Sequence, residues 1–174
     1  MDVQFSPVQS IATSGARAVE PFRIDGGLYL AIAQMAIDVP GQAPGINAGS
    51  SRTTMPILRW REGQLVPHLE LPVSGGEDAE AFRIGDRLFL ATASLRTGEG
   101  PYDLNTQSVI YEWRDNRFEP FQHVPTFAAK QWRHFEIDGR HVLALAQGVV
   151  MPGVAATHPA KSTIFTWDGG KFVE

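Results

Sequence analysis

Apolar and polar residues alternate along most of this chain, in an arrangement that occurs three times. Residues 22–33 carry apolar side chains at every second position on either side of a turn made of Asp and Gly, and residues 82–93 and 135–146 repeat this arrangement. A period of two is typical of β-strands, and Asp and Gly favour the tight turns of hairpins. The pattern therefore predicts an all-β chain with a hairpin at each of these three places.

Each predicted hairpin is followed by an aromatic strand that ends in tryptophan and then by a fourth strand. The tryptophans Trp60, Trp113 and Trp167 are separated by 53 and 54 residues. Repeats of this length, built from short strands, are typical of the blades of a β-propeller. Pro67 and Pro120 place the fourth strand at the outer edge of its blade, because proline cannot donate a hydrogen bond to a neighbouring strand.

The whole chain, residues 1–174, is predicted to be one propeller-type domain with three four-stranded antiparallel blades. Their approximate limits are residues 19–71, 79–124 and 132–167, and residues 5–11 form an additional outer strand before the first blade. Because closed propellers usually contain about four to eight blades, three blades do not close a ring. We therefore expect closure by oligomerisation, as a head-to-tail homodimer of six blades in which residues 5–11 complete a blade of the partner. The alternatives are a separate chain that supplies the missing blades and a longer polypeptide that includes this sequence.

Composition narrows the range of functions without indicating one. The chain has 15 Lys and Arg against 19 Asp and Glu, and a net charge of −4, which does not indicate nucleic-acid binding. It has no cysteine, which excludes disulfides and thiol chemistry. No apolar stretch is long enough to insert into a membrane as a helix. The first residues do not resemble a signal peptide, which leaves the compartment open and favours the cytoplasm.

The repeat resembles the EAR repeat, also called the epitempin or EPTP repeat. The likeness lies in the Phe-x-Ile inner strand, the Leu-rich second strand, the third strand ending in Trp, and residues 5–16, which match the fourth-strand pattern Phe-x-x-x-Gln. It covers nearly the whole chain. The resemblance implies a β-propeller, usually of about seven blades, that serves as a binding platform for proteins or receptors. Gln34, Ser94 and Gln147 stand where the family often has Asn.

The long connections between second and third strands are the first candidate binding surface, since loops usually carry function in such folds. They span residues 34–55, 94–107 and 147–162. The first and last contain apolar runs, which we expect to cover an interface or line a pocket unless they pack on each other. The candidate binding residues in these connections are Met35, Val39, Tyr102, Asp103, Val150 and Met151.

The entries to the inner strands, close to the expected propeller axis, form a second candidate site. Trp132 and Arg133 are candidate binding residues there, and Glu20, Asp78, Glu80 and His134 are the acid and base candidates if the protein is an enzyme. Converging carboxylates can also bind Ca²⁺, and solvated charges at strand ends are the alternative. No motif of a catalytic or metal site is present, and no other cofactor is expected. The sequence thus favours a non-catalytic binding module, with a propeller hydrolase, lyase or isomerase as the alternative.

Overall fold

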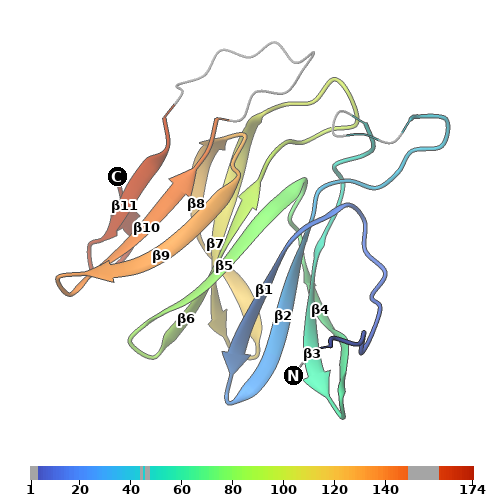
Figure 1. Cartoon of the computed structure of the whole chain (residues 1–174). Coiled ribbons are helices and arrows are strands. Elements are labelled where there is room, and N and C mark those ends of the chain that lie inside the picture. Colours follow the sequence, from blue (N-terminus) through green and yellow to red (C-terminus); the bar gives the residue numbers. More distant parts are fainter. Residues whose placement is uncertain (1–3, 44, 46–47, 149–160) are drawn as a thin grey trace.

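The computed structural model describes residues 4–43, 45, 48–148 and 161–174. These residues form twelve strands in three four-stranded antiparallel sheets, arranged side by side as propeller blades (Figure 1). The predicted all-β propeller architecture with three blades is therefore confirmed. Within the described part of the chain, no helix is long and apolar enough to cross a membrane.

The strands follow one another in space as they do along the chain, from the inner edge of each blade to its outer edge. Blade 1 consists of β1 (Ala16–Ile24), β2 (Gly27–Gln34), β3 (Met55–Arg61) and β4 (Gln64–Leu71). Blade 2 consists of β5 (Gly76–Ile84), β6 (Arg87–Ser94), β7 (Asn105–Arg114) and β8 (Arg117–Phe127). Blade 3 consists of β9 (Gln131–Ile137), β10 (Arg140–Ala146), β11 (Thr163–Trp167) and β12 (Phe172–Val173).

The two ends of the blades differ. Tight hairpins close one end, while the β2–β3 and β6–β7 connections lie at the other, which we call the loop end (Figure 1). In the β1–β2 hairpin Asp25 and Gly26 have φ values of 47° and 79°, and Asp138 and Gly139 repeat this geometry in the β9–β10 hairpin. Gly and Asp are the residues that enter this left-handed region most readily. The predicted hairpin turns thus form as the sequence indicates.

The hydrophobic core lies between blades. We call the face of a blade that points toward the preceding blade its front face and the opposite one its rear face. One cluster joins the rear face of blade 1 to the front face of blade 2 and includes Phe22, Tyr29, Ile57, Leu90, Tyr111 and Phe118. A second joins the rear face of blade 2 to the front face of blade 3 and includes Phe82, Phe89, Ile110, Trp132, Leu143 and Phe165. Each blade therefore depends on its neighbours for burial of its apolar side chains.

The loop end has a smaller core of its own, which includes Met35, Leu95, Leu104 and Phe127. Loops of different blades are also tied together by backbone hydrogen bonds. The Ser51 N–H donates to the Gly98 carbonyl at 2.9 Å, and the Ser51 carbonyl accepts from the Gly75 N–H at 2.9 Å. These contacts hold the connections of blades 1 and 2 in a fixed relation.

The segment before blade 1 does not form a strand within the single chain. Residues 4–13 have no regular secondary structure, and residues 4–10 are exposed. The side chain of Gln9 attaches this segment to blade 1, since its Nε2 donates to the Leu65 carbonyl at 2.9 Å and its Oε1 accepts from the Leu65 N–H at 2.8 Å. The outer strand expected at residues 5–11, with its place in a partner's blade, remains a prediction.

Candidate functional site

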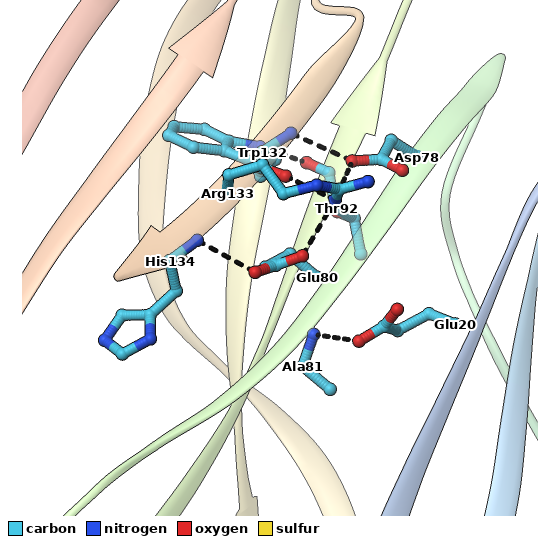
Figure 2. Close-up of polar contacts among 8 residues, drawn as sticks. All are labelled: Glu20, Asp78, Glu80, Ala81, Thr92, Trp132, Arg133 and His134. Carbon is cyan, nitrogen blue, oxygen red and sulfur yellow. Dashed lines mark hydrogen bonds and ion pairs between the residues drawn. The ribbon is translucent and has the colours of Figure 1, made fainter. Parts of the chain in front are cut away.

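The inner strands β1, β5 and β9 lie next to one another, and glutamates connect them in a repeated way (Figure 2). A Glu20 Oε1 oxygen accepts a hydrogen bond from the Ala81 N–H at 3.0 Å. One blade further, Glu80 Oε1 accepts from the His134 N–H at 2.8 Å. Burial raises the pKa of Glu20, an effect that the Ala81 hydrogen bond opposes. Both glutamates therefore join their own blade to the backbone of the next one.

Asp78 forms a second link between blades 2 and 3 (Figure 2). Its Oδ2 accepts from the Trp132 N–H at 2.9 Å and lies 3.4 Å from Nη1 of Arg133, which also donates to Glu80 Oε2 at 2.8 Å. Burial raises the pKa of Asp78 to about 6, although the Trp132 N–H and Arg133 favour the ionised form. Trp132 is completely buried and its Nε1 donates to the Thr92 carbonyl. This tryptophan therefore packs between two blades and offers no exposed surface to a ligand.

A buried carboxylate links all three blades closer to the loop end. Glu77 accepts from Arg17 of blade 1, whose Nη2 lies 2.8 Å from Oε1, and it also forms an ion pair with Lys130 of the segment leading into blade 3. A buried charge of this kind is stable only when it is paired. Glu77 thus has a structural role at the centre of the three inner strands.

The histidine of the predicted acid–base set lies in an aromatic stack. The His134 ring is 4.5 Å from the Phe82 ring, nearly parallel to it, and its Nε2 lies 3.2 Å from Nδ1 of His141. Burial, together with the neighbouring His141, lowers the pKa of His134. The four acid and base candidates are therefore engaged with the neighbouring blade or with aromatic rings. Within the described residues, no group of three or more His, Asp or Glu side chains is arranged to hold a metal ion.

The loop end contains a pocket of about 420 Å³ between residues 13–15 and the first long connection. Met35, Ile37, Asp38 and Val39 line one side of it. Met35 is buried, Val39 is half-buried, and Ile37 and Asp38 are exposed. The Gln42 Oε1 accepts from the Gly49 N–H at 2.9 Å and closes the connection on itself. The structure thus combines an apolar wall with one carboxylate at the mouth of the pocket.

The middle connection lies against the first one. The Tyr102 hydroxyl donates to the Gly49 carbonyl at 2.8 Å, and the Tyr102 ring stacks on the buried guanidinium of Arg96 at 3.6 Å. Asp103 is exposed and its Oδ1 accepts from the Asn105 N–H at 2.9 Å. Tyr102 therefore supports the first connection. The remaining candidates of the loop end, Val150 and Met151, lie outside the described residues.

Two glutamines at the end of the second strand were not expected to have a role, yet each holds the segment that leads into the inner strand of its own blade. Gln34 Oε1 accepts from the Ser14 N–H at 2.6 Å, and Gln147 Oε1 accepts from the Phe127 N–H at 3.0 Å. Both glutamines occupy the same position in the repeat, and this shared position is the signal that identifies them. Ile37 belongs to the apolar run of the first connection, which we expect from the sequence to cover an interface or line a pocket, whereas its exposure depends on how the loop folds.

Comparison with known proteins accounts for the repeat. A family model described as the EPTP domain matches residues 4–51, 64–114 and 117–168. The chain belongs to the EPTP family. The resemblance to the EAR repeat family is thereby confirmed, and the first match includes the segment before blade 1.

The EPTP chain is similar to two mammalian proteins. It is 29% identical over 164 residues to the human protein named thrombospondin-type laminin G domain and EAR repeat-containing protein, an alignment that covers 92% of this chain and 21% of the human protein. The mouse protein of the same name is 27% identical over 132 residues, which cover 75% of this chain and 19% of the mouse protein. The chain thus spans about a fifth of the length of these relatives.

Proposed function

We propose that this EPTP chain is a non-catalytic binding module whose ligand-binding surface is the loop end. The pocket beside the first long connection carries this proposal, because it joins exposed and half-buried apolar side chains, Ile37 and Val39, in one concave site. Its volume of about 420 Å³ lies in the range of sites that bind small molecules or the side chains of a peptide. Exposed apolar groups that gather in this way are typical of binding surfaces.

The lining of the pocket indicates the chemistry of its ligand. Met35, Ile37 and Val39 provide an apolar wall, while Asp38 adds an exposed carboxylate. An apolar group that carries a nearby cation or hydrogen-bond donor satisfies both features. A short peptide with an aliphatic or aromatic side chain next to Lys or Arg has this chemistry.

The enzymatic alternative has weaker support. Glu20 and Glu80 accept hydrogen bonds from the next blade, and Asp78 accepts from the Trp132 N–H, so these carboxylates serve the contacts between blades. The His134 ring stacks on Phe82, and its Nε2 lies next to Nδ1 of His141. Neither of these two contacts joins the ring to one of the carboxylates. To act as general acid and general base, two of these side chains would have to lie within reach of the same reacting group.

A peptide library displayed on phage tests the proposed binding function. Peptides selected on the wild-type chain should contain an apolar residue beside Lys or Arg, and their binding should weaken at least about tenfold with Ile37→Arg or Asp38→Lys, because these changes block or reverse the lining. Asp86→Arg, in the hairpin at the opposite end of blade 2, is the matched control and should leave binding unchanged. Selected peptides that bind all variants equally would place the binding surface elsewhere.

A further inference from the structure

The rear face of blade 3 exposes side chains that are buried at the same position of the other blades. Phe22 and Phe82 are 7% and 6% exposed, because they pack against the next blade, whereas Phe135 is 44% exposed. Likewise Ile57 and Ile110 are fully buried, while Ile164 is 54% exposed. Blade 3 therefore has the rear face of a blade that stacks on another, without the blade that covers it.

The front face of blade 1 is open in the corresponding way. Val19 is 61% exposed, whereas Ala79 and Trp132, at the same position of blades 2 and 3, are buried. The aromatic strands show the same difference: Trp167 packs against Phe89 of the preceding blade, while Trp60 is exposed. The open rear face of blade 3 and the open front face of blade 1 thus correspond to the two surfaces that meet where one blade packs on the next.

The segment before blade 1 occupies the place of an outer strand that belongs to a preceding blade. Gln9 binds both backbone groups of Leu65, as Gln122 of β8 binds the carbonyl and the N–H of Phe172 in blade 3, at 2.8 and 2.9 Å respectively. The bond between Ser14 and Gln34 is likewise repeated between Phe127 and Gln147. Residues 9–14 therefore contact blade 1 as residues 122–127 contact blade 3.

Two grooves at the outer edges of the blades support this placement. One lies between Ile11 and Ala12 and the strands of blade 1, with Leu58 and Pro67 in its lining. The other lies between Pro72 and Val73, which follow β4, and the strands of blade 2, with Tyr111 and Pro120 at the matching positions. The segment before blade 1 therefore forms with blade 1 a groove like the one that the residues after β4 form with blade 2. The EPTP match that begins at residue 4 also counts this segment as part of a repeat.

Within the part of the chain that the structure describes, blade 3 has an unpaired outer edge that this segment fits. Among these residues, β12 pairs with Thr166 and Trp167 of β11 alone. In blade 2 the corresponding outer strand continues, with Ile110 opposite Gln122 and Val109 opposite His123. When the same register is applied to residues 8–13 beside β11, Gln9 lies opposite Ile164 and Ser10 lies opposite Thr163. An unpaired strand edge beside exposed apolar side chains is a favourable site for addition of a strand.

The polar residues at the two open faces also agree with stacking. Between blades, a glutamate accepts from a backbone N–H in the middle of the next inner strand, as Glu80 does from His134. At the open faces these two positions are Arg133 and Pro21. Blade 3 thus lacks the glutamate at this position, and blade 1 lacks the N–H that the glutamate would accept from, because proline has none. Stacking of the two faces therefore leaves no backbone donor unsatisfied here.

We infer that two copies of this chain associate head to tail, with the front face of blade 1 on the rear face of blade 3 of the other copy. Residues 8–13 of each copy add to β11 of the other, where they continue the strand that β12 begins. Two copies provide six blades, within the range of about four to eight that closes a propeller, whereas three copies would exceed it. The association goes beyond the proposed binding function and does not depend on it, because the pocket at the loop end is formed within one chain.

The mass of the 174-residue chain in solution, measured by light scattering after size exclusion, tests the association. The wild-type chain should have twice the mass of one copy. Ile164→Lys should halve this mass, because it places a charge on the rear face of blade 3. Ile37→Lys is the matched control, since Ile37 is similarly exposed at 46% but lies at the loop end, and it should remain a dimer. Because Ile37 lines the proposed ligand pocket and Ile164 does not, failure of one proposal is distinguishable from failure of the other.

Cysteine crosslinking tests the strand exchange itself, since the chain has no cysteine of its own. Separately purified Ser10→Cys and Thr163→Cys chains, mixed and oxidised, should form a covalent heterodimer. Ser10→Cys mixed with Thr166→Cys is the control and should not, because Thr166 already pairs with Val173 and lies about 10 Å further along β11. A monomeric wild-type chain would overturn the association. A dimer that crosslinks equally with both partners, or with neither, would overturn the exchange of residues 8–13.

Discussion

At the scale of single residues, Gly75 leaves the least room for a Cβ among the glycines compared in the described part of the chain. Its φ is +57°, and a Cβ there would lie 2.0 Å from the Arg96 carbonyl oxygen. Gly75→Ala should therefore lower the free energy of unfolding by more than about 3 kcal/mol or prevent folding. Gly85→Ala is the control, because Gly85 has a φ of +58° with no atom within 4 Å of its Cβ position, and should cost about 1 kcal/mol. Chemical denaturation of both variants checks the difference, and equal losses would contradict it.

Asp78 makes the stability of the protein depend on pH. Because burial raises its folded-state pKa from 3.8 to about 6, the folded chain binds this proton more tightly than the unfolded chain does. The contribution to stability is thus present below about pH 4 and is lost as the pH rises through about 6. Asp78→Asn keeps an oxygen acceptor for the Trp132 N–H and removes the charge.

Relative to wild type, Asp78→Asn should gain about 2 kcal/mol between pH 4.5 and 7.5. Urea denaturation of both proteins at these two pH values measures this gain, and Glu20 and His134 largely cancel from the difference because both proteins contain them. A stability difference that is the same at both pH values would show that Asp78 does not titrate in this range.

At the scale of elements, glutamine side chains hold the outer strands of blades 1 and 3 by their backbone groups. Gln122 bonds both backbone groups of Phe172, at the start of the two-residue strand β12. Gln122→Ala should therefore increase hydrogen exchange at the Phe172 amide and cost about 1 kcal/mol of stability. Gln9→Ala should increase exchange at the Leu65 amide in the same way. Amide exchange measured by NMR checks both changes, and unchanged exchange at Phe172 would mean that pairing with β11 alone secures β12.

The elements themselves could be predicted from the sequence, because the period of two and the Asp and Gly turns act locally. The hairpin at Asp25 and Gly26 is an example in which the residues and the positive φ values agree. The candidate site was less predictable. Trp132 was placed at a possible binding site, yet its burial depends on the position of blade 2, which local pattern does not encode. The exposure of Ile37 and the pocket beside it likewise depend on how the connection of residues 34–55 folds onto the segment before blade 1.

At the scale of the whole molecule, the three blades are covered unequally. Blade 2 is packed on both faces, whereas blade 3 exposes Phe135 and Ile164 on its rear face. In a repeat protein each unit is stabilised by its neighbours, so the units at the ends open most easily. In the single chain, amides of β9 and β10 should therefore exchange faster than those of β5 and β6.

Hydrogen–deuterium exchange on the Ile164→Lys chain at low concentration measures this difference between blades. If two wild-type copies associate as proposed, exchange in β9 and β10 should slow to the rate of blade 2 at high concentration. Equal exchange in all three blades of the dilute chain would show that it unfolds as one cooperative unit.

The position of Gln9 against blade 1 also bears on how such a protein can change in evolution. Each repeat supplies its outer strand to one blade and its other strands to the next, so adjacent repeats are interlocked and not merely stacked. A tandem duplication of the coding sequence would need only a short connection to carry the chain from β12 into residues 8–13 of the added copy, within one continuous strand. Blades gained by duplication would thus already have the contacts that join them to their neighbours. A symmetric assembly of small chains could therefore become a single large chain while the interfaces between its blades are kept at every step.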